Sequence, residues 1–339
     1  MTDPQFTLIV PSYNGGGYLR QCIESIQAQT YDSFTLAVLD DGSTDGSMEW
    51  LRGIGDPRVT IYPAREHLGI VRNWARARDI PKAEFMMIIG QDDLLDPNYL
   101  AVMDALTRTH PGAGLYHAHF RFINGRGGVT RSCRPLPARE TAGQYLAALF
   151  TGKRDTYGTG YLMRSTRYEA IGGIPPFEKL LLADDALWMA LMLGSEKVTA
   201  RDECFSCRLH ARSVSGGTEW GSWLAALPPY TSFLANLAGC DGNFAQAFKS
   251  YAPGYFQNWG RLLYTLALTQ ATRQNRRVDG QARQRIAETL AQIAPCLPPA
   301  FDPPSFAAGN GMRAREWINR SAMTRGAYNA YVRLRYGRE

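Results

Sequence analysis

The stretch Leu39-Asp-Asp-Gly-Ser-Thr-Asp-Gly-Ser47 decides the fold of this chain. It begins at the end of the apolar run Thr35–Leu39 and leads into Ser47–Leu51, where a helical pattern starts. An apolar run that ends in carboxylates and a glycine-containing turn before a helix is typical of the strand–turn–helix unit of a parallel sheet. The carboxylate of Asp40, at the strand tip, suits a hydrogen bond from a nucleobase imide. Asp45 equally suits capping of the next helix, and the stretch alone leaves both roles open.

The same unit recurs on both sides of this stretch. Strands are predicted at Phe6–Val10, Val59–Tyr62 and Phe85–Ile89, and helices at Tyr18–Ile26 and Ile70–Arg78. Alternation of strands and helices with short loops predicts an α/β fold with a mostly parallel sheet flanked by helices. Such sheets bind ligands at the carboxyl ends of their strands. Those ends are Pro11–Asn14, Asp40–Ser43 and Gly90–Asp93, and they carry carboxylates, glycines and small polar groups.

The second half of the chain changes from mixed to helical. A strand is expected at Leu115–Phe120 and a helix at Leu181–Leu193. Gly216-Gly217 and Pro228-Pro229 interrupt the pattern, and beyond them helices are expected at Leu224–Leu237, Gly260–Thr269 and Gln281–Ile293. We therefore expect a domain boundary near Gly216, between an α/β domain over residues 1–215 and a helical C-terminal region over 216–339.

The composition is that of an ordinary soluble globular protein. The 339 residues are 45% hydrophobic and 20% charged, with a net charge of +6 and a pI near 9.0. No run reaches the roughly 20 apolar residues that span a bilayer, and no export signal is seen, so the expected location is the cytoplasm. The six cysteines are spread along the chain and predict no disulfide framework. Cys204-Phe-Ser-Cys207 lacks the second ligand pair of a structural zinc site.

Two acidic pairs are candidates for a functional site. Asp92-Asp93 follows an apolar strand, where carboxylates suit Mg²⁺ or Mn²⁺, although such pairs are often only turn or cap residues. Asp184-Asp185 begins a helix, where the helix dipole stabilises acidic residues. A carboxylate at a helix start beside a cleft equally suits a general base.

Together these segments resemble the family-2 glycosyltransferases of the GT-A fold. The resemblance covers roughly residues 5–215, and the ordered set of segments carries it. They are Val10–Asn14, Leu19–Thr30, Leu39–Ser47, Gly69–Asn73, Gln91–Pro97, Gly158–Gly160, Ile171–Gly173, Asp184–Trp188 and Arg208–Ser215.

The resemblance implies a metal-dependent inverting glycosyltransferase with a GT-A nucleotide-diphospho-sugar transferase fold. Residues 1–215 would form its catalytic domain, with a nucleotide-binding part over about 1–100 and an acceptor part over about 101–215. It implies a UDP- or dTDP-sugar donor, a divalent cation (Mn²⁺ or Mg²⁺), and a glycan or lipid-linked acceptor in cell-envelope or exopolysaccharide synthesis. Asp184 would be the catalytic base, with Asp185 as the alternative. Asp92, Asp93 and His210 would serve the metal. The donor would contact Pro11, Tyr13, Asn14, Asp40, Asp41, Arg72, Asn73, Gln91 and Arg208.

The chain departs from the family pattern at two positions. Relatives usually carry an aspartate two residues before the metal aspartate, and Gly90 stands there. Ribose contact would then pass to Gln91 or be lost. Ala183 stands where an acidic residue often precedes the catalytic aspartate, which makes Asp184 a less direct match.

The C-terminal segment is basic and aromatic. Met312–Glu339 holds seven arginines, with Trp317 and three tyrosines between them. Such a segment suits peripheral contact with the anionic inner face of the cell membrane, or a docked helix with a solvated basic face. No nucleic-acid recognition module is apparent, so nucleic acid is not expected as a partner.

Two other functions fit parts of this pattern. A sugar nucleotidyltransferase also combines an α/β nucleotide domain with a metal, but Arg20 is the only cation near the first glycine-rich turn. A non-catalytic nucleotide-sugar-binding protein is consistent with Gly90. Product identity and turnover separate these alternatives from a glycosyltransferase.

Overall fold

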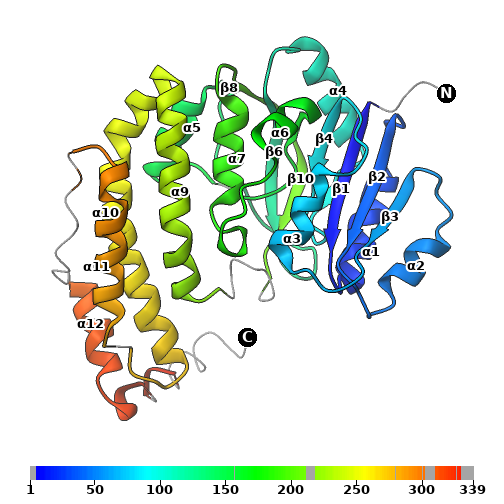
Figure 1. Ribbon diagram of the computed structural model, residues 1–339. Coiled ribbons are helices and arrows are strands. Elements are labelled where there is room, and N and C mark those ends of the chain that lie inside the picture. The colour runs from blue at the N-terminus through cyan, green and yellow to red at the C-terminus, as the bar shows by residue number, and fades with distance from the viewer. Residues whose placement is uncertain are drawn as a thin grey trace.

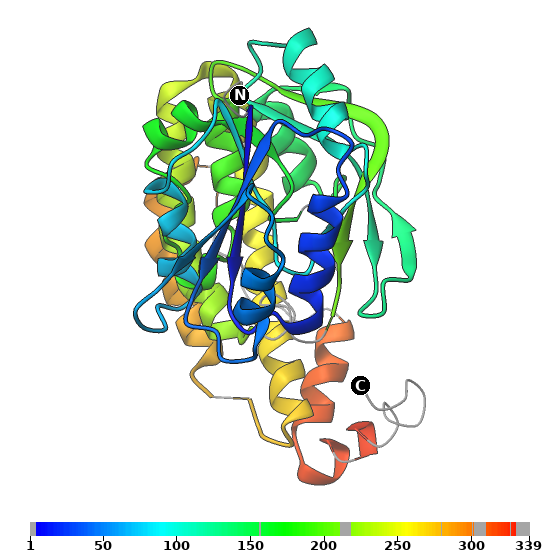
Figure 2. The same ribbon diagram turned by 90° about the vertical axis from the view of Figure 1, so that its right-hand side faces the viewer.

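A single ten-stranded mixed sheet organises the chain. The computed structural model describes residues 5–155, 157–210, 218–278, 280–299, 301, 310–325 and 327–329. The strand order is β3-β2-β1-β4-β9-β6-β10-β5, with β7 paired to β6 and β8 paired to β10. Figures 1 and 2 show this sheet on one side of the molecule and the long C-terminal helices on the other.

The N-terminal half of the sheet is parallel, as expected from the repeated strand–helix unit. Its strands are β1 (Phe6–Ser12), β2 (Phe34–Asp40), β3 (Val59–Pro63) and β4 (Phe85–Ile88). Leu8, Ile9 and Val10 are fully buried, because helices cover both faces of these strands. The parallel pairing brings the carboxyl ends of β1, β2 and β4 to one edge of the sheet.

The second half of the sheet mixes directions. β9 (Leu162–Arg164) is antiparallel to both β4 and β6 (Leu115–Ile123), whereas β6 is parallel to β10 (Lys197–Arg208). β5 (Leu94–Leu95) pairs antiparallel with the end of β10. This pairing carries residues near 208 to the same edge as the end of β4. The short strands β7 and β8 are Val129–Ser132 and Arg139–Glu140.

Helices pack on both faces of the sheet and create two hydrophobic clusters. One face is covered by α1 (Gly16–Gln27), α2 (Ser47–Gly53) and α4 (Tyr99–Thr109). The other cluster contains residues of η1, α5 to α7 and the C-terminal helices. The bounds on that side are α3 (Ile70–Ala75), η1 (Arg76–Arg78), α5 (Ala142–Phe150), α6 (Ser165–Ile171), η2 (Glu178–Leu180) and α7 (Ala183–Met192).

The C-terminal helices are α9 (Trp220–Cys240), α10 (Gly242–Arg273), α11 (Ala282–Ile293), η3 (Ala294–Cys296) and α12 (Asn310–Asn319). Two of them, α9 and α10, are longer than the sequence pattern predicts, whereas α11 begins one residue after its predicted start and ends where predicted. The interruption expected at Pro228-Pro229 is wrong, because both prolines lie inside α9. That helix buries Leu227, Tyr230 and Leu234 in the larger cluster, and packing of this face outweighs the lost backbone hydrogen bonds.

The proposed boundary between the two regions falls at Gly216-Gly217, outside the described residues. Residues of α9, α10 and α11 belong to the same hydrophobic cluster as Ile9 and Leu39 of the sheet. The helical region therefore shares a core with the sheet, and its division from the catalytic part stays a proposal. None of the described helices is both long and apolar enough to cross a bilayer.

Candidate functional site

A cavity of about 830 Å³ lies at the carboxyl ends of β1 and β4. The β1 side contributes Pro11 and Tyr13, and the turn before α1 contributes Asn14–Gly17. The β4 side contributes Gln91 and Asp92, and further lining comes from Trp74 and His210. Four of the residues that the family resemblance assigns to the donor line this cavity: Pro11, Tyr13, Asn14 and Gln91.

Gln91 ties the two strand ends together. Its Oε1 accepts hydrogen bonds from Ser12 Oγ at 2.8 Å and from the Tyr13 backbone N–H at 3.2 Å. Its Nε2 donates to the Tyr13 carbonyl at 3.3 Å. A Cβ on Gly15 would lie 2.5 Å from Gln91 Oε1, so this close approach requires glycine at position 15.

Tyr13 and Asn14 form the rim of the cavity. The Tyr13 ring packs on His67 with centroids 4.1 Å apart. Asn14 Oδ1 accepts from Thr44 N at 2.8 Å, and the Asn14 N–H donates to Ser43 Oγ at 3.0 Å. These bonds join the first turn to the stretch that follows β2.

Asp40 and Asp41 lie behind the rim and are both buried. Asp40 Oδ1 accepts from Ser43 N at 3.0 Å. Asp41 accepts from the backbone N–H groups of Leu68 at 2.6 Å and Gly69 at 3.0 Å. Asp41 thereby fixes the backbone that leads into α3. Neither aspartate lines the two cavities described here, so nucleobase contact by Asp40 stays a proposal.

Arg72 and Asn73, both assigned to the donor by resemblance, also lie off these two cavities. Arg72 is exposed and lies 3.7 Å from Glu66. Asn73 is buried, donates to the Leu39 carbonyl at 2.9 Å and accepts from Arg76 at 2.8 Å. In this structure Asn73 therefore fastens α3 to β2.

The carboxylate of Asp92 faces the imidazole of His210 across the cavity wall. His210 Nε2 lies 2.7 Å from Asp92 Oδ2, although 118 residues separate them in sequence. Both side chains are partly accessible. β10, which ends at Arg208, carries His210 to the end of β4. A carboxylate oxygen and an imidazole nitrogen are both ligands for Mn²⁺, and Mg²⁺ accepts the carboxylate.

Asp93 lies deeper than Asp92 and is bonded within the fold. It accepts a hydrogen bond from Thr159 Oγ1 and another from the Arg208 backbone N–H at 2.9 Å. Burial, and next the charge of Asp92, raise the pKa of Asp93 to about 8. Any cation at Asp93 would have to compete with these two donors.

Arg208 joins the end of β10 to the Asp92 backbone and to α1. Its Nε donates to the Asp92 carbonyl at 2.8 Å and its Nη2 donates to Gln21 Oε1 at 2.7 Å. Its guanidinium also lies 4.7 Å from the ring centre of Tyr18. These contacts hold the β10 end against α1. They also place a cation beside the Asp92 backbone.

Asp92 and His210 are the residues that would bind one divalent cation at this site. In the described part of the chain, no three His, Cys, Asp or Glu side chains gather into a ready-made metal cluster. Mg²⁺ in nucleotide sites typically binds one or two carboxylates and takes its other ligands from phosphates and water. Asp92 on the donor cavity fits this pattern for Mg²⁺, and Asp92 together with His210 suits Mn²⁺.

Gly90 lies directly beneath these carboxylates. A Cβ at this position would lie 2.8 Å from Asp92 Oδ1 and 3.0 Å from Asp93 Oδ2. A side chain here therefore requires both aspartates to shift. The departure from the family pattern at Gly90 thus has a local reason, because this arrangement of Asp92 and Asp93 leaves no room for a third carboxylate.

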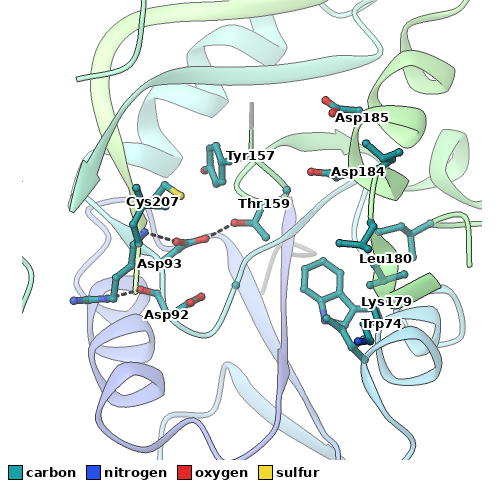
Figure 3. A pocket seen from close by; sticks show the side chains of 18 of the residues that line it. Trp74, Asp92, Asp93, Tyr157, Thr159, Lys179, Leu180, Asp184, Asp185 and Cys207 are labelled. Atoms are coloured by element: carbon teal, nitrogen blue, oxygen red, sulfur yellow. Dashed lines mark hydrogen bonds between the residues drawn. The ribbon is translucent and has the colours of Figure 1, made fainter. Parts of the chain in front are cut away.

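A second cavity, of about 520 Å³, adjoins the first. The two share Ile70, Trp74, Gly90 and Asp92. Figure 3 shows Asp92 and Asp93 on one side of the second cavity and Asp184 on the other. The Asp184 carboxylate points towards Tyr157 and Thr159.

Asp184 and Asp185 lie in the first turn of α7, as predicted, and differ in their contacts. Asp185 is buried and its Oδ1 accepts a hydrogen bond from the Tyr145 hydroxyl at 2.8 Å. Burial raises the pKa of Asp184. Burial, and next the charge of Asp184, raise the pKa of Asp185 to about 7. A carboxylate with a raised pKa at a cavity wall suits a general base near neutral pH.

The backbone before α7 is strained. Lys179, Leu180 and Leu182 have φ values of 51°, 59° and 65°, in the left-handed region that disfavours side chains with a Cβ. All three line the second cavity. Strained backbone concentrates at functional sites, where the surrounding packing maintains it.

Sequence reasoning missed much of the second cavity. Gly158–Gly160 was matched as a family segment without a role, yet Thr159 bonds Asp93 and Gly158 lies against Asp184. Trp74 was expected only as part of a helix. Trp223, Tyr255 and Trp259 come from the region that matched no motif, and no sequence signal connects them to the site.

The N-terminal part of the chain is similar to proteins of a known family. The sequence model of glycosyl transferase family 2 matches residues 7–166. The chain is 28% identical to the putative glycosyltransferase EpsH of Bacillus subtilis over 224 residues, which are 63% of this chain and 59% of that protein. It is 31% identical to the glycosyltransferase GlyG of Streptococcus pneumoniae over 99 residues, which are 29% of this chain and 33% of GlyG. The match thus spans less than two thirds of either relative.

A solved structure shows the same fold. The structure of Staphylococcus aureus TarS 1–349 in complex with UDP-GlcNAc superposes with a TM-score of 0.66 at 14% identity, covering 96% of this chain and 92% of TarS 1–349. The superposition includes the helical C-terminal region. The expected GT-A fold with a helical C-terminal region is thereby confirmed.

Proposed function

The chain belongs to the family-2 glycosyltransferases, and from this premise we propose that it transfers a sugar, with inversion, from a UDP- or dTDP-sugar to an acceptor hydroxyl. One observation carries the proposal. Two adjoining cavities share the wall at Gly90 and Asp92, and the second presents Asp184 across from that wall. A donor diphosphate at Asp92 would leave its sugar between the two aspartates.

The donor would occupy the cavity of about 830 Å³. Its nucleoside would lie along the rim formed by Tyr13 and Asn14, with Gln91 beside it. Asp40, close behind the rim, would read the base after a small movement of the Ser43 turn that it now bonds. Asp41, Asn73 and Arg76 would hold the rim and α3 in place.

A divalent cation, Mn²⁺ or Mg²⁺, would be held by Asp92 and His210. When bound, it would neutralise charge on the nucleoside diphosphate leaving group. Arg208 would hold the Asp92 backbone in place by donating a hydrogen bond to the Asp92 carbonyl. Asp93, buried and bonded to Thr159, would fix the backbone next to the cation.

Asp184 would take the proton from the acceptor hydroxyl. Its carboxylate points into the second cavity, whereas Asp185 is bonded to Tyr145. The acceptor oxygen would then attack the anomeric carbon from the side opposite the diphosphate, so that the new bond forms with inversion. Asp185 would hold the start of α7 in place by accepting the hydrogen bond from the Tyr145 hydroxyl.

The wider role and location are also proposals. A glycan or lipid-linked acceptor, made in the cytoplasm for the cell envelope or an exopolysaccharide, is consistent with relatives that are themselves named glycosyltransferases. Peripheral membrane contact is supported at α12, where Trp317 is 61% exposed and Met323, just beyond, is 81% exposed, with Arg313 and Arg320 nearby in sequence. Arg333, Arg335 and Arg338, also expected there, lie outside the described residues.

The proposal is tested by screening nucleotide sugars for release of nucleoside diphosphate, with and without EDTA. We expect release with a UDP- or dTDP-sugar and its loss in EDTA. Release of pyrophosphate would show a nucleotidyltransferase instead. Binding of nucleotide sugar without turnover and without a metal requirement would show a non-catalytic binding protein.

A further inference from the structure

The second cavity is built mainly from apolar and aromatic side chains. Its walls come from α5, the segment before α7, the end of β10, and helices α9 and α10. Its apolar and aromatic lining includes Leu149, Leu180, Leu209, Trp223, Tyr255 and Trp259. A sugar chain needs hydrogen-bond partners for several hydroxyls, and this part of the cavity offers few.

The aromatic wall is held in place by its own packing. Trp223 and Trp259 have ring centroids 5.7 Å apart, and Tyr255 meets Trp259 edge-on at 6.1 Å. Tyr255 also stacks on Phe150 at 3.7 Å. Leu209 stands at the β10 end of the same cavity and is 52% exposed. A preformed apolar wall of this kind gains free energy by covering an apolar group.

The charges around the cavity argue against an anionic group. Four carboxylates line it, from Asp92, Asp93, Asp184 and Asp185, against two cations among the described residues, Lys179 and Arg208. Arg208 already bonds the Asp92 carbonyl and Gln21. Asp184 must be deprotonated to act as the base, and its charge would repel an anionic group bound beside it.

We infer that the acceptor carries an uncharged apolar group, alkyl or aryl, next to the hydroxyl that is glycosylated. This inference rests on the proposed function. The hydroxyl lies at Asp184, and the apolar group extends along Leu149 and the aromatic wall towards α9 and α10. The cavity volume of about 520 Å³ is within the range of pockets that enclose a small organic ligand.

The test measures binding of three matched probes to the full chain by isothermal titration. They are octyl β-D-glucopyranoside below its micellar concentration, methyl β-D-glucopyranoside, and octyl β-D-glucopyranosiduronate, which adds a carboxylate. We expect the octyl glucoside to bind at least tenfold more tightly than the methyl glucoside and than the octyl glucuronide. Equal affinity of octyl and methyl glucosides, or tighter binding of the glucuronide, would overturn the inference.

Two variants and one control locate the binding. Leu209→Glu alters a half-exposed side chain and should not disturb folding, whereas Trp223→Ser removes part of the aromatic wall. Each should reduce the preference for the octyl chain to less than twofold. Trp317→Ser, on the exposed face of α12, should leave it unchanged. An octyl preference that survives in Leu209→Glu would place the chain elsewhere and overturn the inference.

The proposed function is assessed separately in the same preparations. Titration with UDP and Mn²⁺, without any glucoside added, reports on the donor side alone. Absence of UDP binding together with a clear octyl preference would refute the transferase proposal and leave the apolar site in place. Normal UDP binding without an octyl preference would refute only the apolar acceptor.

Discussion

The Tyr145 hydroxyl donates a hydrogen bond to Asp185 Oδ1 at 2.8 Å and holds one member of the acidic pair in the core. Both groups are buried, and the Arg154 guanidinium covers the Tyr145 ring at 3.6 Å. The neighbouring Asp184 points into the cavity (Figure 3). The two adjacent carboxylates thus have different surroundings, which is the basis for assigning them different roles.

Tyr145→Phe keeps the ring against Arg154 and removes only the donor to Asp185. The variant should lose about 1–3 kcal/mol of unfolding free energy, because a buried acceptor is left without its partner. Chemical denaturation measures this loss. An unchanged unfolding free energy would show that the bond contributes nothing. Tyr31→Phe, in a less buried hydrogen-bonded site, serves as the comparison.

Asp185→Asn should stabilise the fold at alkaline pH. The pKa of Asp185 is raised in the folded state to about 7, above its ordinary value of 3.8. Its protonated form therefore favours folding below about pH 4, and this contribution is lost as the pH rises through 7. Asparagine keeps a neutral partner for Tyr145, so the gain in Tm over wild type should be larger at pH 8 than at pH 5. A gain that is equal at both pH values would contradict a raised pKa. Asp32→Asn, at a highly exposed carboxylate, is the control.

Activity should fall towards acidic pH. Burial raises the pKa values of both Asp184 and Asp185, and a general base must be deprotonated to act. The pH profile of kcat/KM should therefore decline on the acidic side at a pH above 3.8, the ordinary pKa of an aspartate. A decline centred near pH 4 in the wild type would be incompatible with a buried base.

Gly90→Ala tests the packing beneath Asp92, which would hold the cation together with His210. The new Cβ would lie 2.8 Å from Asp92 Oδ1 and must displace that side chain from His210. Affinity for Mn²⁺ in the presence of UDP should fall by roughly tenfold, since groups that orient a ligand typically contribute this much. Gly53→Ala has open space around its new methyl group and should leave Mn²⁺ affinity unchanged. Full retention of affinity in Gly90→Ala would show that Asp92 does not need this geometry.

Lys179→Gly and Lys179→Ala together measure the backbone strain before α7. Lys179 has φ 51° and ψ 25°, a conformation that costs a residue with a Cβ about 1–2 kcal/mol. The glycine variant should be more stable than the alanine variant by about 1 kcal/mol in denaturant unfolding. At Lys249, exposed on α10, the order should be reversed, because glycine disfavours a helix. Equal stabilities at position 179 would remove strain as an explanation.

Local patterns in the sequence predict the parallel half of the sheet well. Apolar runs such as Phe6–Val10 and the carboxylates after them are features of a few adjacent residues, and they predict both strands and strand ends. The pairing of Asp92 with His210 spans 118 residues and depends on how β5 and β10 meet, so only the family resemblance could suggest it.

The remainder of the site follows from packing over long distances. Nothing in the spacing of Trp223 or Trp259 connects them to Asp184, because α9 and α10 reach the site through their packing on α5 and α7. The interruption expected at Pro228 was wrong for a similar reason, since burial of α9 maintains a helix that local propensity disfavours. The roles assigned to Asp40, Arg72 and Asn73 depend on a bound donor and stay predictions.

The proposed reaction depends most on Asp184 as the general base, and Asp184→Asn tests this role directly. Donor affinity is measured by titration with UDP and Mn²⁺, and turnover by release of nucleoside diphosphate in the presence of an acceptor. Turnover should fall by at least about a hundredfold with donor affinity within twofold of wild type, because a general base contributes about 10²–10⁴-fold. Near-normal turnover in Asp184→Asn would contradict the assignment.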